Sequence, residues 1–233
     1  MITKQIVYVM LSGGIDSTTA LARAMKMHDA EVFAVSFDYG QRHDTELLAA
    51  FQICNHYNIQ HRIIQIEMPK TMLTDKSVAL PEVPYSEIKG ISPTYVPFRN
   101  GLMLSRLTSY ICGTHYDPTQ KEDKRDTLIY WGAHAEDAEG WAYPDCSNEF
   151  IGAMANAIYV GTYHRVRLVA PFANMMKQEI IREGTGYDVP YDLTWSCYSG
   201  GDVHCGKCST CIARKQAFQR AHVPDPTIYA QLC

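Results

Sequence analysis

The sequence lacks three features that would each point to a class of function. It has no run of about 18 apolar residues, so it predicts no membrane-spanning helix. It has no basic excess, because 21 lysines and arginines face 25 aspartates and glutamates, and this disfavours a nucleic-acid substrate. No small-residue cleavage site follows the apolar residues 1–10, so they predict a core strand rather than a signal peptide. We therefore expect a cytoplasmic protein whose eight cysteines are thiols or metal ligands.

Short apolar runs alternate with amphipathic segments along the chain. The runs predict strands at 6–10, 31–37, 62–66, 128–131 and 165–170. The amphipathic segments predict helices at 17–27, 45–57, 100–112, 147–159, 174–183 and 209–220. This alternation predicts an α/β fold, a Rossmann-like doubly wound parallel sheet. We expect an α/β domain over residues 1–192 and a small cysteine-bearing lobe over 193–233, packed as one functional unit.

A glycine turn, Ser-Gly-Gly-Ile-Asp-Ser at residues 12–17, joins the first expected strand to the first expected helix. Backbone N–H groups at a helix N-terminus favour anions, and glycine lets the backbone approach a phosphate. The predicted ATP-binding residues are Leu11, Ser12, Gly13, Gly14, Ile15, Asp16, Ser17 and Thr18. A carboxylate repels phosphates unless it holds Mg²⁺, so Asp16 predicts a magnesium ion; the alternative is an ordinary early-helix acid.

Four cysteines near the end of the chain have the spacing C-x₇-C-x₂-C-x₂-C. They are Cys197, Cys205, Cys208 and Cys211. Four thiolates this close in sequence can surround one ion, which predicts a structural Zn²⁺ site, with an iron–sulfur cluster as the alternative. His204 lies within the spacing, but four sulfurs complete a tetrahedral site without it.

The glycine turn resembles the phosphate loop of the N-type ATP pyrophosphatases, which cleave ATP between its α and β phosphates. It is not the Gly-x₄-Gly-Lys-Ser/Thr loop of kinases and GTPases. Three further segments are Phe-Asp-Tyr-Gly-Gln-Arg-His at 37–43, Tyr-Val-Pro-Phe-Arg-Asn at 95–100 and Tyr-Pro-Asp-Cys at 143–146. With the loop and the cysteines, they resemble the 7-cyano-7-deazaguanine synthase family from residue 6 to about 218.

This resemblance implies a fold, a reaction and a set of partners. The fold is that of the adenine nucleotide alpha hydrolases, with a zinc site and often a homodimer. The reaction converts 7-carboxy-7-deazaguanine, ammonia and ATP to the nitrile through an adenylated acid, an amide and an adenylated amide. Adenylation is needed because a carboxylate has no good leaving group, and the charge that develops calls for cations nearby.

The resemblance also implies which side chains act. The expected catalytic residues are Asp16, His43, Arg99 and Lys177, and the expected substrate-binding residues are Tyr39, Arg42, Arg99 and Asp145. Each basic residue has the alternative of a solvated surface charge, and Asp145 that of a turn residue. The sequence departs from many members at Ser147, where they carry arginine, and in a charged insertion at 117–126. Ser147 instead predicts a helix N-cap.

Two other functions remain open on the sequence. A tRNA thiolase can share the ATP loop and a cysteine cluster, and it predicts a basic surface and catalytic cysteines outside any metal site. A relative that stops at the amide would use the same motifs. A zinc-binding module without enzymatic activity leaves the ATP loop unexplained.

Overall fold

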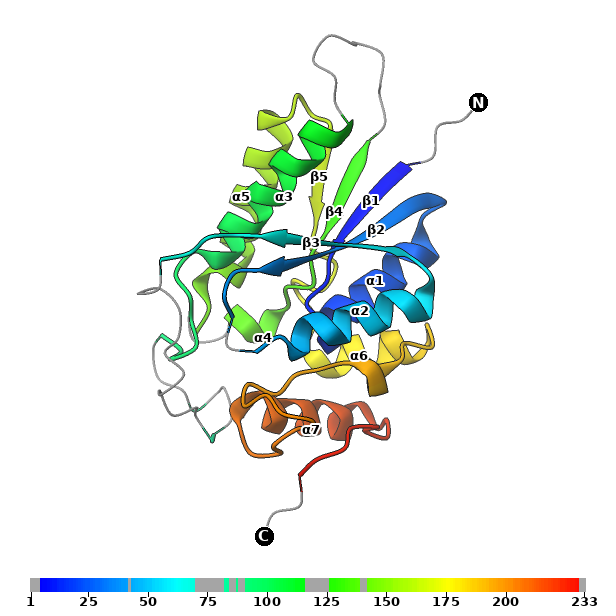
Figure 1. Ribbon diagram of the computed structural model, residues 1–233, viewed down its shortest axis with the longest axis vertical. Coiled ribbons are helices and arrows are strands. Elements are labelled where there is room, and N and C mark those ends of the chain that lie inside the picture. The colour runs from blue at the N-terminus through cyan, green and yellow to red at the C-terminus, as the bar shows by residue number, and fades with distance from the viewer. Residues whose placement is uncertain are drawn as a thin grey trace.

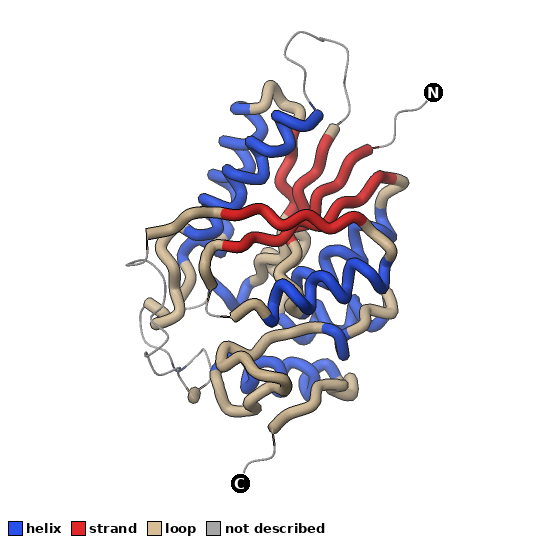
Figure 2. Tube along the Cα trace, in the orientation of Figure 1, coloured by secondary structure: helices blue, strands red, loops and turns tan. Residues whose placement is uncertain are grey.

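The computed structural model describes residues 5–41, 43–69, 82–83, 87, 91–115, 126–138 and 142–230. Its centre is a parallel sheet of five strands in the order β3-β2-β1-β4-β5 (Figures 1 and 2). The strands are β1 (Gln5–Met10), β2 (Ala30–Asp38), β3 (Gln60–Gln65), β4 (Thr127–Tyr130) and β5 (Val166–Val169). The chain builds outward from β1 to β3, then crosses back to place β4 on the other side of β1. This reversal is the doubly wound topology that the alternating pattern predicts.

Helices cover both faces of the sheet (Figure 1). One face carries α1 (Ile15–Met27), α2 (Thr45–Tyr57) and α6 (Lys177–Thr185), and the other carries α3 (Arg99–His115) and α5 (Asn148–Gly161). Strand β1 serves both layers because alternate side chains point to opposite faces. Tyr8 packs in the layer with α3, whereas Val7 and Val9 pack against α1 and α2.

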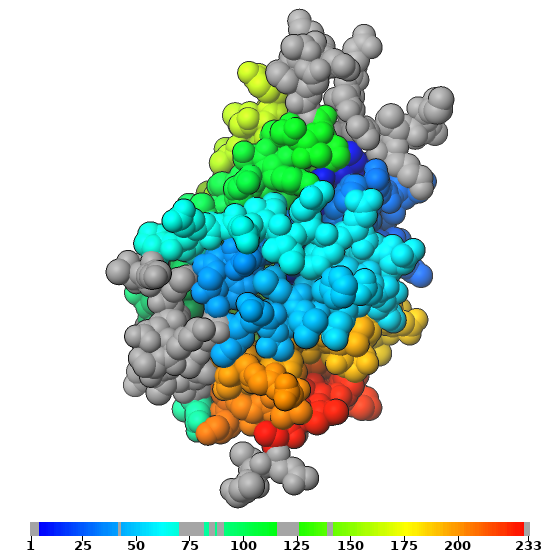
Figure 3. Space-filling model, viewed as in Figure 1, coloured from blue at the N-terminus to red at the C-terminus, as the bar shows by residue number. Residues whose placement is uncertain are grey.

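The C-terminal segment packs on the α/β domain through a third apolar cluster. Helix α7 (Ser209–Ala221) contributes Phe218, which joins Ile15 of α1 and Ile181 of α6 in this cluster. In Figure 3 the C-terminal segment, coloured orange to red, lies directly against α2 (blue) and α6 (yellow). The two parts thus share a core, and the boundary at residue 192 stays a prediction. Among the described residues, no helix combines the length and apolar character needed to cross a bilayer.

The expected elements are all present, and one boundary shifts in a way that matters for the site. The last helix of the sheet layer begins at Lys177 rather than at residue 174. The backbone N–H of Met176 donates to Glu179 Oε2 at 2.8 Å, and this cap fixes the start of α6. Lys177 is therefore the first residue of its helix. Most of the insertion at 117–126 lies outside the described residues.

Two short elements that the pattern does not predict lie between β4 and α5. They are α4 (Ala135–Ala138) and the 3₁₀ turn η4 (Pro144–Cys146). Ser147 follows η4 and caps α5 as predicted, because its Oγ accepts a hydrogen bond from Phe150 N at 3.2 Å. A second 3₁₀ turn, η5 (Tyr191–Leu193), leads into the cysteine segment.

Candidate active site and metal centre

A cavity of about 270 Å³ opens at the carboxyl ends of β1, β2 and β4. It lies where the strand order reverses between β1 and β4, the usual ligand position in doubly wound sheets. Its walls include residues from the phosphate loop, from the segment after β2, from the start of α3 and from the segment after β4. They are Leu11, Ser12, Asp16, Ser17, Tyr39, Glu46, Arg99, Asn100, Gly132, Asp137, Cys146 and Tyr198, among others.

The loop from Ser12 to Ser17 has the geometry of an anion site. Gly13 has φ +82°, and a Cβ there would lie 2.5 Å from Glu46 O, so only glycine fits between the loop and α2. The N-cap of α1 is Gly14, which has no side chain to occupy the first N–H groups of the helix. The Oγ of Ser17 accepts from Ser12 N at 3.2 Å and closes the turn. The helix start is thus held in place with donors available to a phosphate.

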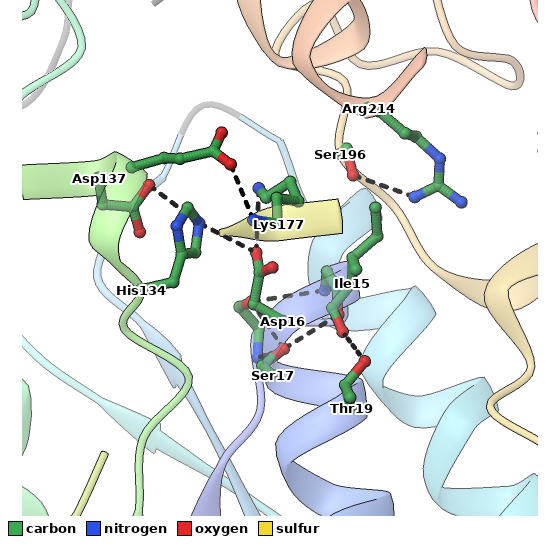
Figure 4. Close-up of polar contacts among 12 residues, drawn as sticks. Ile15, Asp16, Ser17, Thr19, His134, Asp137, Lys177, Ser196 and Arg214 are labelled. Carbon is green, nitrogen blue, oxygen red and sulfur yellow. Dashed lines mark hydrogen bonds and ion pairs between the residues drawn. The ribbon is translucent and has the colours of Figure 1, made fainter. Parts of the chain in front are cut away.

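Asp16 and Lys177 form an ion pair beside this loop (Figure 4). Lys177 Nζ lies 3.1 Å from Asp16 Oδ2, and both side chains are largely buried. Burial raises the pKa of Asp16, but Lys177 and His134 together hold it below the ordinary value. Asp16 Oδ1 is buried and makes no hydrogen bond within the described residues. An ionised carboxylate with one unused oxygen fits a divalent cation, as Mg²⁺ prefers oxygen ligands.

Tyr39 and Arg99 contact each other in the wall of the same cavity. Arg99 Nη1 donates to the Tyr39 hydroxyl at 3.0 Å, and the guanidinium carbon lies 5.5 Å from the centre of the Tyr39 ring. Both residues line the cavity, as does Glu46. Burial raises the pKa of Glu46, and Arg99 acts against that rise. This part of the wall therefore offers an aromatic face beside a fixed positive charge.

His43 lies at the junction with the cysteine segment. Its Nε2 is 2.9 Å from the backbone carbonyl oxygen of Tyr198, to which it donates. A Cβ on Gly200 would lie 2.5 Å from His43 Nδ1, so the ring packs directly on the glycine. His43 is not among the described residues that line the cavity. Its catalytic role stays a prediction, and Arg42 lies outside the described residues.

Asp145 is buried, and one of its oxygens is used within the protein. Its Oδ2 accepts from the backbone N–H of Asn100 at 3.0 Å, near the start of α3. Burial raises the pKa of this carboxyl. Asp145 therefore caps α3, and its contact with the guanine edge stays a prediction. The predicted substrate residue Tyr39 lines the cavity, whereas Phe98 of the 95–100 segment packs on Phe150 with ring centres 5.8 Å apart.

Several residues in or beside the cavity were not predicted as site residues from the sequence motifs. Gly132, His134 and Asp137 come just after β4, and Tyr198 follows the first cysteine of the cluster. A Cβ on Gly132 would lie 2.9 Å from the carbonyl carbon of Asp16, so this glycine lets the end of β4 touch the start of α1. For Gly132, His134 and Asp137, the position at the carboxyl end of a predicted parallel strand was the available signal, and Tyr198 had none.

The four predicted metal ligands converge. The sulfurs of Cys197, Cys205, Cys208 and Cys211 all lie within 4.8 Å of one another, and Cys205 Sγ is 3.9 Å from Cys211 Sγ. Zn–S bonds of about 2.3 Å place the sulfurs of a tetrahedral site ~3.8 Å apart, so the set fits a single metal ion.

His204 lies beside this set without joining it. Burial lowers the pKa of His204 to about 4, so its ring is neutral at physiological pH. Its Nε2 accepts from Ser196 N at 3.1 Å. The backbone N–H of Trp195 in turn donates to Gly13 O at 2.8 Å, so the cysteine segment is tied to the phosphate loop.

Comparison with solved structures agrees with the fold. The U34-tRNA thiolase NcsA from Methanococcus maripaludis with its [4Fe-4S] cluster aligns with a TM-score of 0.50, at 15% identity. The alignment covers 94% of this chain and 68% of that one. At this identity the likeness concerns the fold alone.

Comparison of sequences reaches further. The family model described as "Queuosine biosynthesis protein QueC" matches residues 6–222. The 7-cyano-7-deazaguanine synthase of Caldicellulosiruptor bescii is 40% identical over 225 residues, covering 95% of this chain and 96% of the relative. The synthase of Thermoplasma acidophilum is 38% identical over 232 residues, covering 95% and 90%. The chain therefore belongs to the QueC family of queuosine biosynthesis enzymes, the 7-cyano-7-deazaguanine synthases.

Proposed function

We propose that this protein uses ATP to convert 7-carboxy-7-deazaguanine and ammonia to 7-cyano-7-deazaguanine. The observation that carries the proposal is that one cavity joins the phosphate loop to the Tyr39–Arg99 pair. A substrate bound there lies with its carboxylate within reach of ATP held at the helix start. Family membership supports the same reaction.

On the nucleotide side, the proposed step is attack of the substrate carboxylate on the α-phosphate of ATP, with pyrophosphate leaving. The N–H groups at the start of α1 and the hydroxyls of Ser12 and Ser17 bind phosphate oxygens. Lys177 supplies a positive charge next to them. Asp16 Oδ1 would hold Mg²⁺, which when bound neutralises charge on the phosphates.

On the substrate side, the ring of Tyr39 stacks on the deazaguanine and Arg99 binds its carboxylate. We propose further contacts from Asp145 to the guanine edge and from Arg42. Ammonia then displaces AMP from the adenylated acid to give the amide. A second ATP activates the amide oxygen, and loss of AMP gives the nitrile, so one site performs both activations on one substituent.

We propose that the cysteine set holds one structural Zn²⁺ ion. Four sulfurs close the coordination sphere, which is typical of structural sites. Residues 193–233 then form a metal-bearing lobe on the α/β domain of residues 1–192, and Tyr198 of this lobe completes the cavity wall. A homodimer is proposed on family grounds, and light scattering of the purified protein tests it.

The described cysteines outside the metal set, Cys54, Cys112 and Cys146, give no support to the tRNA thiolase alternative. Burial raises the pKa of Cys54 to about 12, and burial also raises the pKa of Cys112 and of Cys146. Cys146 Sγ accepts from the side-chain amide of Asn100 at 3.3 Å. A nucleophilic cysteine needs a lowered pKa, and none of these three has one.

Product mass tests the proposal. The protein is incubated with ATP, Mg²⁺, ammonium and 7-carboxy-7-deazaguanine, and the nitrile mass is expected. An amide that never dehydrates supports the relative that stops at the amide, and no AMP release refutes both. Metal analysis is expected to find about one zinc ion per chain, whereas iron with visible absorbance contradicts the zinc assignment.

A further inference from the structure

His134 is a buried histidine whose Nε2 has only ion-pair contacts and whose Nδ1 has no hydrogen-bond partner within the described residues. Its side chain is 2% exposed, and neither ring nitrogen makes a hydrogen bond within the described residues. A buried polar group without a partner is costly, so such groups are rare and often functional. The backbone at His134 pairs with Phe172 in a parallel bridge, so the position from which the ring projects is fixed.

Two carboxylates face this imidazole. His134 Nε2 lies 3.3 Å from Asp137 Oδ1 and 3.6 Å from Asp16 Oδ2. Figure 4 shows the ring between the two acids, with Lys177 on the far side of Asp16. Lys177, Asp16, His134 and Asp137 thus form one chain of polar contacts that connects the phosphate loop to Asp137 in the cavity wall.

Asp137 is the end of this chain that reaches into the cavity. It lines the cavity, and its side chain is 31% exposed. The titratable groups that act on it from neighbouring elements are Lys177 of α6 and Asp145 and Cys146 of η4. Asp145 Oδ2 already accepts a hydrogen bond from Asn100 N, and Lys177 already forms an ion pair with Asp16. Asp137 is therefore placed to meet a reacting group between the phosphate loop and η4.

The proposed reaction needs a proton acceptor at this place. When ammonia attacks the adenylated acid, a C–N bond forms, the C–O bond to AMP breaks and the nitrogen gives up one proton. When the adenylated amide becomes the nitrile, the second C–O bond to AMP breaks and the same nitrogen gives up its other two protons. All three protons of ammonia therefore leave one atom, and each departure needs a base within hydrogen-bond reach.

We propose that Asp137 accepts the protons that leave the substrate nitrogen, and that His134 is the positioning residue that orients Asp137. This inference rests on the proposed function. It gives a chemical reason for a buried imidazole with ion-pair contacts beside the cavity, and it assigns Asp137 to proton removal rather than to ATP activation.

The experiment separates adenylation from proton removal. Exchange of pyrophosphate into ATP is measured with 7-carboxy-7-deazaguanine and without ammonium. It reports adenylation of the acid, a step that takes place before ammonia reacts. Amide and nitrile formation with ammonium, followed across pH, report the proton-removing steps. The variants are Asp137→Asn, Asp137→Ala with added formate, and His134→Gln. Asp126→Asn is the matched control, because Asp126 is 55% exposed and pairs with Arg167 on the surface.

The expected result is that Asp137→Asn keeps exchange within about threefold of the wild type but forms amide at least ~100-fold more slowly. Formate should restore amide formation in Asp137→Ala. His134→Gln should move the pH at which amide formation is half maximal, whereas purely structural damage lowers the rate equally at every pH. Asp126→Asn should match the wild type.

Other outcomes overturn the inference. Asp137→Asn with a normal rate of amide formation shows that another group is the base. Equal loss of exchange and amide formation places Asp137 in adenylation instead. Absence of exchange in the wild-type protein refutes the proposed function itself, and this result is distinct from any effect confined to the variants.

Discussion

Replacing Gly132 by alanine tests the contact that brings β4 to the phosphate loop. The new Cβ would lie 2.9 Å from the carbonyl carbon of Asp16, and 3.0 Å from both Asp16 O and Ser17 N. Ordinary contacts of a Cβ are 3.4–4 Å. All three atoms belong to the backbone, so no change of rotamer relieves the overlap. The start of α1 or the end of β4 must therefore move by a few tenths of an ångström.

The displacement should affect both stability and catalysis. Overpacking of this kind costs about 1–3 kcal/mol in the free energy of unfolding. For a chain of this length, each kcal/mol lowers the melting temperature by roughly 2–4 °C. Because a misplacement of ~1 Å can cost ~100-fold in rate, a smaller shift of the loop should lower kcat/KM for ATP by about tenfold.

Thermal unfolding and steady-state AMP release measure these two effects. Gly113→Ala is the matched control, because Gly113 is an exposed residue of α3 and a Cβ there meets nothing within 4 Å. The control should melt at the same or a higher temperature, since alanine favours helix over glycine by up to ~1 kcal/mol. A Gly132→Ala protein that keeps both its melting temperature and its kcat/KM for ATP would falsify this account of the loop.

Three further substitutions test other parts of the structure. Lys177→Met removes one of the groups that hold the pKa of Asp16 below its ordinary value, so this pKa should rise. Asp16 acts as a carboxylate above its pKa and becomes protonated as the pH falls, so in the variant AMP release should decline at a higher pH than in the wild type. An unchanged acid limb of the pH profile contradicts this. Cys205→Ser should reduce bound zinc from about one ion per chain to near zero and lower the melting temperature, and full retention of zinc argues against the site. Ser147→Ala removes the acceptor of Phe150 N, which should cost ~1 kcal/mol in the free energy of unfolding, and an unchanged unfolding curve refutes the cap.

Features set by neighbours in sequence were predictable. The apolar run of β1, the glycine turn after it and the spacing of the four cysteines each depend on residues close together along the chain. Ser147 likewise caps α5 through an atom only three residues away. The sequence also predicted the α/β class, because alternating strands and helices pair as a parallel sheet.

Features set by distant segments were not predictable in the same way. His43 donates a hydrogen bond to Tyr198 O, and Asp145 accepts one from Asn100 N. No local sequence pattern predicts either partner. The start of α6 at Lys177 depends on its own cap and on Glu136, whose Oε1 accepts from Lys177 N at 2.8 Å.

The sequence by itself determined the glycine turn, the cysteine cluster and the strand–helix order, since each follows from local spacing and backbone chemistry. Only the tertiary structure decided that Gly132, His134 and Asp137 stand beside Asp16. The physical reason is the doubly wound sheet: it places the carboxyl ends of β1 and β4 next to each other, although the strands are far apart in the chain.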